Sequence, residues 1–340
     1  MKSDQTWLAG IVAAVSLASP MAALADGDVN VYSYRQPYLI QPLLDAFTEE
    51  TDIKVNVVFA ENGIAQRLQR EGRNSPADAV LTVDIARLDE LVQKDLTQAV
   101  DSELLEENIP AEYRHPEGKW FGLTRRVRAI YTSEERVEEG AITSYEDLAD
   151  ERWDDRICTR SGKHPYNVAL ISSMIAHHGE EKTQEWLEGV KDNLARKPQG
   201  GDRDQISAIS EGVCDVALGN SYYYGVMLSD ENQKSQAEAA RIVFPNQDGR
   251  GAHVNLSGAA VAKHAPNREN AIAFIEFLAS DKAQQMYADM NYEYPVKEDV
   301  QPSGVVASWG EFEADDLPLN EIAKHREAAV KMVDRVGFDN

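Results

Sequence analysis

The chain has 340 residues, and its 34 basic against 58 acidic side chains give a formal net charge of −24. This acidity excludes a general nucleic-acid binder and disfavours docking on anionic lipid, because both kinds of partner need a basic face. Hydrophobic residues make up 43% of the chain, too much for a disordered protein, and the length is typical of about two domains.

Residues 1–25 have the pattern of an export signal. Lys2 precedes an apolar stretch from Trp7 to Ala18 that is too short to span a bilayer, and Ala23-Leu24-Ala25 supplies the small residues of a cleavage site. The alternative interpretation is a buried N-terminal helix. Since there is no Cys at this site, a lipid anchor is not expected. The pattern predicts a protein released outside the cytoplasm after cleavage behind Ala25.

The chain then alternates strand and helix patterns. Strands are expected at Val29–Ser33, Lys54–Ala60 and Ala79–Val83. Helices are expected at Leu39–Glu50, at Ile64–Glu71 and from Ala86 to Leu91, where apolar residues recur at helical spacing. This β-α-β-α-β order predicts a parallel sheet with right-handed crossovers.

The same alternation returns in the second half of the chain. Further strands are expected at Arg156–Thr159, Cys214–Leu218, Arg241–Phe244 and Ser257–Val261. Further helices are expected at Asn167–His177, Thr183–Leu194, Asp204–Ser210, from an Asn267 cap to Leu278, and from Pro318 to Val336.

The length and the repeated pattern predict two α/β lobes, each with a mixed, mostly parallel sheet flanked by helices. Two extended runs, Trp120–Thr132 and His253–Gly258, are expected to cross between the lobes. We assign residues 26–126 and about 251–301 to an N-terminal lobe, and about 127–250 and 302–340 to a C-terminal lobe. A ligand would bind in the cleft between them, at the carboxyl ends of strands.

Cys158 and Cys214 are the two cysteines of the chain, and both lie in the exported part. Two cysteines in an oxidising compartment most often pair. The alternative is two buried thiols. Zinc would need more ligands than these two distant residues offer.

The run Asn220–Gly225 contains Tyr222, Tyr223 and Tyr224 directly after an expected strand. Consecutive side chains diverge in a strand or a helix, so these three phenols cannot all enter one core, and some must face a cleft. Tyr166 stands in a similar place between a strand and a helix. Phenolate oxygens favour a highly charged cation such as ferric iron, and the alternative is that these tyrosines pack in a core.

Four stretches resemble the bacterial periplasmic ferric-ion-binding proteins, the substrate-binding subunits of iron(III) ABC importers. They are Val31–Pro37, Ser75–Asp78, Asn193–Gly200 and Gly219–Gly225. The resemblance covers essentially all of the exported chain. It implies a type II, transferrin-like two-lobe fold, with Tyr166, Tyr222 and Tyr223 as iron ligands and Tyr224 as a packing residue.

Some members of that family add a His and a Tyr from the first strand–helix loop, where this chain has Gln36 and Pro37. It therefore resembles the subgroup that uses three tyrosines and an exogenous anion, with carbonate as the expected anion. Tyr34 and Tyr38 lie nearby and leave further ligation open.

The resemblance also places Arg126 beside the iron and its anion. Strand alternation puts Arg126 and Arg128 on one face and Arg125 on the other, and surface charge compensation is the alternative role for these three cations. Additional candidates for holding the anion are Ser161, Gly162, Arg35 and Gln36.

The resulting hypothesis is a monomeric, non-enzymatic periplasmic protein that delivers ferric iron to an inner-membrane ABC permease with its ATPase. One alternative is a binding protein for an organic or oxyanion solute, with the tyrosines lining its pocket. The other is an extracytoplasmic enzyme, although the sequence contains no evident nucleophile–base pair.

Overall fold

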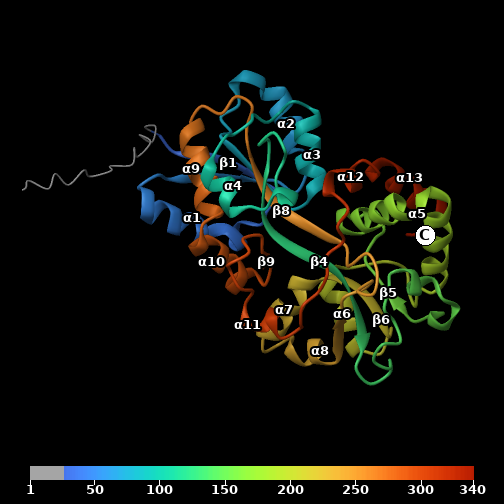
Figure 1. The fold of residues 1–340 in the computed structure, drawn as a ribbon. Helices are drawn as coiled ribbons and strands as arrows, with labels where there is room; N and C mark the ends of the chain where they lie inside the picture. Colours follow the sequence, from blue (N-terminus) through green and yellow to red (C-terminus); the bar gives the residue numbers. More distant parts are fainter. Residues whose placement is uncertain (1–26) are drawn as a thin grey trace, which may run out of the picture.

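The structure is a computed structural model that describes residues 27–340, so the expected export signal at residues 1–25 lies outside the described residues. The chain forms two lobes, and the long strand β4 (Phe121–Ser133) runs from one into the other (Figure 1). Among residues 27–340, none of the helices combines the length and the apolarity needed to cross a bilayer.

The strands form a mixed sheet whose order is β2-β1-β3-β8-β4-β6-β5, with β7 and β9 also paired to β4. Their bounds are β1 Val29–Ser33, β2 Val55–Phe59, β3 Ala79–Thr82, β5 Ile157–Cys158, β6 Val216–Asn220, β7 Ala240–Val243, β8 Val254–Val261 and β9 Tyr294–Pro295. The expected parallel pairing of the first three strands is confirmed, because β1 pairs parallel with β2 and β3. The sheet as a whole has fewer parallel strand pairs than expected, since among the described strands all pairings of β4 and β8 are antiparallel.

Strand β4 belongs to both lobes, as expected for an extended run that crosses between them. Its first half, Phe121–Val127, pairs with β8, and its second half pairs with β6 and β7. The switch occurs between Val127, which pairs with Val254, and Arg128, which pairs with Asn220. Side chains at this point therefore lie between the two lobes.

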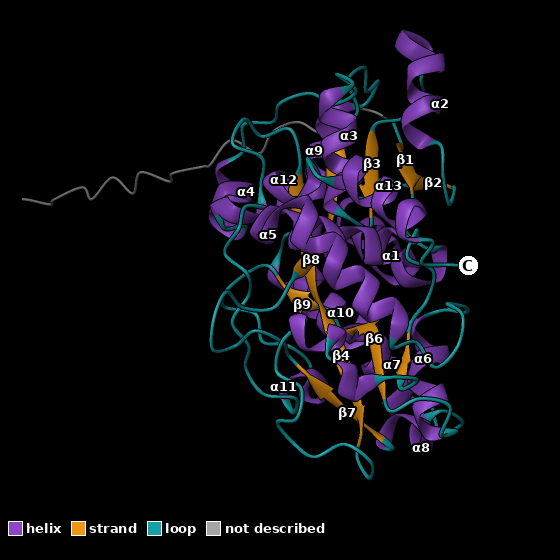
Figure 2. Cartoon of the chain, turned by 90° about the vertical axis from the view of Figure 1, so that its right-hand side faces the viewer, coloured by secondary structure: helices purple, strands orange, loops and turns teal. Residues whose placement is uncertain are grey.

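Helices cover the faces of the sheet (Figure 2). Their bounds are α1 Pro37–Thr51, α2 Ile64–Glu71, α3 Ile85–Gln93, α4 Glu103–Asn108, α5 Pro165–Asp192, α6 Asp202–Ser210, α7 Ser221–Ser229, α8 Lys234–Glu238, α9 Arg268–Leu278, α10 Asp281–Asn291, α11 Gly304–Ala307, α12 Leu319–Ala323 and α13 Arg326–Val336.

The two helices expected between Asn167 and Leu194 are confirmed, because Gly179, with a non-helical φ of +80°, interrupts α5 between them. Two other expectations for the helices differ from the structure. The expected tail helix is divided into α12, which packs against α3 and α5, and α13, which packs against α5. Asn267 stands at the start of α9 without a side-chain cap hydrogen bond, and its amide nitrogen donates to Asp78 at 3.2 Å.

Each lobe has its own apolar core. One core joins α1 and α9 through Phe47 and Phe274, and the other joins α5 and α13 through Leu187 and Met332. A further cluster places Val306, Leu319 and Ile322 with Ile85 and Leu88 of α3. Helix α12 also packs against α5, and α11 packs against α7, so the segment from α11 to α12 contacts both lobes.

Candidate metal centre

A cavity of about 890 Å³ lies between the lobes. One wall comes from the loop after β1, with Arg35 and Gln36, and from Tyr38 in the first turn of α1. The opposite wall holds Tyr166, Tyr222 and Tyr223. The structure therefore brings the three tyrosines singled out from the sequence into one cleft.

The tyrosines occupy the first turns of two helices. Tyr166 is the second residue of α5, and Tyr222 and Tyr223 follow Ser221 at the start of α7. The phenol oxygens of Tyr166 and Tyr222 are 3.3 Å apart, and the ring centroids of Tyr222 and Tyr223 are 4.1 Å apart. Two helix starts that follow neighbouring strands thus present three phenols to one point.

Tyr224 points away from this cleft, because side chains in a helix turn by about 100° per residue. It is buried in the core of the C-terminal lobe between Tyr131 and Trp309. Its hydroxyl donates to the carbonyl oxygen of Ala240 at 2.7 Å. The structure therefore gives Tyr224 a packing position, as the resemblance implied.

The phenols of Tyr222 and Tyr223 are held in their neutral form. Burial raises the pKa of Tyr222 well above its usual value, and the neighbouring Tyr166 and Tyr223 raise it further, while Arg126 opposes the shift. Burial likewise raises the pKa of Tyr223. Phenolate formation here requires a cation that compensates both desolvation and mutual repulsion.

Arg126 on β4 is one of two arginines that face these phenols. The other, Arg160, lies 5.4 Å from the ring centroid of Tyr166 and is paired with Asp202. The guanidinium of Arg126 lies 5.6 Å from the ring centroid of Tyr166, and its Nη1 donates to the Ser257 hydroxyl at 3.1 Å. The side chain is only 2% exposed, and no carboxylate of the described chain forms an ion pair with it. Arg35 donates to the same Ser257 hydroxyl at 2.8 Å but is paired with Glu293. Of the two buried guanidinium groups of the cleft, Arg126 is thus the one without a carboxylate partner; the exposed Arg203 on the cavity wall also forms no ion pair within the described residues.

The alternation expected along β4 is confirmed. Arg125 lies on the other face, where it donates to the Tyr113 hydroxyl at 2.9 Å and to the Pro295 carbonyl at 3.3 Å. Arg128 shares the face of Arg126 but is neutralised by Asp202 at 2.8 Å.

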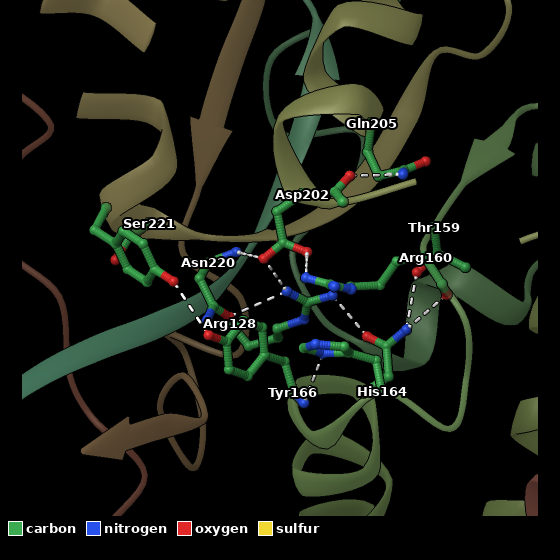
Figure 3. Close-up of polar contacts among 12 residues, drawn as sticks. Arg128, Thr159, Arg160, His164, Tyr166, Asp202, Gln205, Asn220 and Ser221 are labelled. Carbon is green, nitrogen blue, oxygen red and sulfur yellow. Dashed lines mark hydrogen bonds and ion pairs between the residues drawn. The ribbon is translucent and has the colours of Figure 1, made fainter. Parts of the chain in front are cut away.

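Asp202, at the start of α6, organises the loops that carry the tyrosines (Figure 3). Its carboxylate is fully buried, and it pairs with Arg128 and with Arg160 at 3.2 Å while accepting from the Asn220 backbone N–H at 2.9 Å. Arg128 also donates to the Asn167 side chain at 2.6 Å. This network joins the segment before α7 to the first turn of α5, and so fixes how Tyr166 and Tyr222 face each other.

Ser161 and Gly162 do not line the cleft in the structure. The Ser161 hydroxyl and the Gly162 backbone N–H each donate to the carboxylate of Asp339 at 2.7 Å. A Cβ on Gly162 would lie 2.8 Å from Phe338, so this glycine is packed against the C-terminal segment. The donors expected to hold an external anion are therefore engaged by the chain's own carboxylate.

The remaining candidates lie between the end of β1 and the first turn of α1. Gln36 is exposed and lines the cavity beside Arg35. The Tyr34 hydroxyl accepts from the backbone N–H of Ile64 at 3.1 Å, so it is engaged at the start of α2. Tyr38 is 72% exposed on the wall opposite the tyrosine cluster.

Cys158 and Cys214 form a disulfide, with their Cα atoms 5.9 Å apart, which confirms the expected pairing. Cys158 ends β5, which leads to Tyr166, and Cys214 precedes β6, which leads to Tyr222. The bond thus joins the two segments that present the phenols.

Sequence reasoning did not single out several residues that line the cleft. They are Glu61, Asn62, Arg87, Arg160, His164 and Arg203. Burial lowers the pKa of His164 to about 3, with Arg160 adding to the effect, so this imidazole is neutral. Within residues 27–340, His, Cys, Asp and Glu side chains form no group of three that could hold a metal ion. The oxygen donors that cluster in the cleft are therefore the phenols of Tyr166, Tyr222 and Tyr223.

Comparison with known proteins gives concordant similarities. Residues 74–311 match the family model described as "Bacterial extracellular solute-binding protein". Iron uptake protein A1 of Synechocystis sp. is 43% identical over 328 residues, which cover 94% of this chain and 91% of that protein. The crystal structure of the apo ferric ion-binding protein A of Pasteurella haemolytica is 56% identical, covers 92% of this chain and 99% of that chain, and superposes with a TM-score of 0.89. A Trichodesmium protein in complex with iron and citrate is 39% identical, with a TM-score of 0.87 and coverage of 92% and 100%.

Proposed function

This chain belongs to the bacterial extracellular solute-binding protein family, in the group of periplasmic ferric-ion-binding proteins, and from that membership we propose that it captures ferric iron in the interlobe cleft for delivery to an ABC permease. The proposed ligands are the phenolates of Tyr166, Tyr222 and Tyr223. The observation that carries this assignment is the 3.3 Å separation of the Tyr166 and Tyr222 phenol oxygens inside the cleft.

Three phenolates balance the charge of a ferric ion, and an octahedral ion offers more positions than they fill. We propose that an anion occupies part of the remainder and that Arg126 grips it. An anion added to a neutral iron–phenolate unit makes the complex negative, so a cationic neighbour is needed. A guanidinium can hold a planar carbonate through two parallel hydrogen bonds, which favours carbonate as the anion. The Trichodesmium relative carries citrate, so a carboxylate is the alternative to test.

We further propose that the protein works as a monomer in the periplasm, after removal of residues 1–25, and that its partners are a permease and an ATPase. The role is binding and delivery without chemical turnover. Periplasmic location is supported by the family, and the expected cleavage behind Ala25 is a separate prediction that N-terminal sequencing of the exported protein can check.

The decisive experiment is metal analysis with a visible spectrum, before and after chelation and ferric citrate addition. Phenolate–iron charge transfer is expected to colour the wild type. Tyr222→Phe is expected to lose most of the band, because it removes a ligand oxygen. Tyr224→Phe is the matched control, since it removes a neighbouring hydroxyl that donates to Ala240. A protein that stays colourless after ferric citrate addition would instead support the organic or oxyanion solute binder.

A further inference from the structure

A second, much smaller cavity lies behind Arg126, at the point where β4 passes from one sheet to the other. Its volume is about 10 Å³. Its lining residues are Arg126, Arg128, Tyr166, Asn220, His253 and Asn255. A space of this size holds about one water molecule.

Polar atoms without partners are concentrated around this cavity. Five of them belong to four of its lining residues: Arg126 Nη2, Arg128 Nε, Asn220 Nδ2 and both ring nitrogens of His253. None of the five has a hydrogen-bond partner within the described part of the chain, and all four side chains are buried. Leaving one such group unsatisfied costs about 1–3 kcal/mol, so a native protein rarely gathers several in one place.

We infer that this cavity binds one ordered water molecule, which accepts hydrogen bonds from the guanidinium groups of Arg126 and Arg128 and donates one to the imidazole of His253. Guanidinium and amide N–H groups can only donate, whereas a neutral imidazole has one donor and one acceptor nitrogen. Water can serve both kinds of partner at once, but a halide can only accept.

The charge state of His253 agrees with this arrangement. Burial lowers the pKa of His253 to about 4, with Arg128, Arg126 and Arg250 also lowering it and Asp315 opposing them. The imidazole is therefore neutral at physiological pH and keeps one nitrogen as an acceptor. Its backbone is also fixed, because its N–H donates to the Tyr145 hydroxyl at 3.0 Å, which in turn donates to the Arg128 carbonyl at 2.6 Å.

The water gives Arg126 a second support. Ser257 accepts from Nη1 of Arg126, and the water accepts from Nη2, so the guanidinium is held from both ends. His253 acts through the water and is a positioning residue for Arg126. The evidence for the water site is the cavity and the unpaired atoms around it. Its effect on iron retention rests on the proposed function.

The first test is a high-resolution crystal structure of the signal-free protein, with one crystal form grown in bromide. We expect a single solvent peak between His253 and the two arginines, without anomalous signal. An empty cavity, or side chains that pair directly with one another, would overturn the inference. An anomalous bromide peak would assign the site to a halide and would also overturn it.

The second test compares His253→Gln with His253→Phe in iron-loaded protein. The phenyl ring fills the cavity and offers no acceptor, so iron loss to excess chelator is expected to speed up about tenfold and bicarbonate dependence to weaken. His253→Gln keeps polar atoms near the cavity and is expected to stay within about threefold of the wild type. Thermal unfolding of each variant reports general damage to the fold. If His253→Phe does not fold, His253→Leu takes its place.

Equal iron-loss rates for folded wild type, His253→Gln and His253→Phe would reject the positioning role. Failure of the wild type to bind iron would reject the proposed function. The solvent peak in the crystal would then still decide the water site on its own.

Discussion

The phenol oxygens of Tyr166 and Tyr222 lie 3.3 Å apart across 56 residues of chain, the same sequence separation that the Cys158–Cys214 disulfide spans. Each tyrosine follows its cysteine by 8 residues. Both segments run from paired strands, β5 and β6, into a helix start. The disulfide therefore joins the two segments at one end, and the phenols meet at the other.

The disulfide is expected to stabilise the C-terminal lobe. The bond closes a loop in the unfolded chain and lowers its conformational entropy, which is expected to raise the free energy of unfolding by about 4 kcal/mol. Urea unfolding of Cys158→Ser/Cys214→Ser against the wild type measures the loss. Mass spectrometry of unreduced protein should give a mass two hydrogens below the reduced form. Two thiols that alkylate freely without reductant would contradict the bond.

Iron affinity is expected to fall as the pH falls. The phenols of Tyr222 and Tyr223 have raised pKa values in the absence of iron, so each phenol that becomes a ligand must release its proton. Lower pH favours the protonated, iron-free form, and the apparent affinity should drop by about tenfold per pH unit for each phenol that ionises. Competition titrations against a chelator of known stability at several pH values measure this slope. An affinity that does not change between about pH 5 and 8 would contradict a tyrosinate site.

Arg126→Ala is expected to weaken both iron retention and its dependence on bicarbonate, because it removes the unpaired guanidinium beside the phenols. Arg125→Ala is the matched control on the same strand, since Arg125 faces Tyr113 and Pro295 instead. Visible spectra and iron-loss rates with and without bicarbonate measure both effects. A wild-type spectrum and affinity that survive bicarbonate depletion would reject carbonate while leaving the tyrosine ligands in place.

Asp202→Ala is expected to destabilise the protein by about 3–5 kcal/mol, because it leaves Arg128 buried without its counter-charge. The exposed Asp192 at the end of α5 provides a control, and Asp192→Ala should change stability by less than about 0.5 kcal/mol. Urea unfolding of the iron-free proteins compares the two. Equal midpoints for both variants would show that the Asp202 network does not support the fold.

Much of the local structure was predictable from the sequence, because it depends on short-range periodicity. The bounds of β1 and α2 are those expected, and the strand that crosses the lobes was recognisable as a long extended run. The structure departs from the expected elements where tertiary packing determines the helix bounds, as at the break between α12 and α13.

The residues of the candidate site were likewise predictable in part from the sequence. A run of three tyrosines after a strand indicates by itself that some phenols face a cleft, and the family resemblance identifies which ones. The sequence also supplies the alternation that separates Arg125 from Arg126.

Only the tertiary structure decided which partners the polar side chains take. It paired Asp202 with Arg128 and Arg160, and it turned Ser161 and Gly162 toward Asp339. Such partners are distant in the chain and follow no helical or strand period, so no local sequence pattern predicts them. They are selected because buried polar groups must find partners within the folded lobe, and Arg126 is left without a carboxylate partner in the cleft.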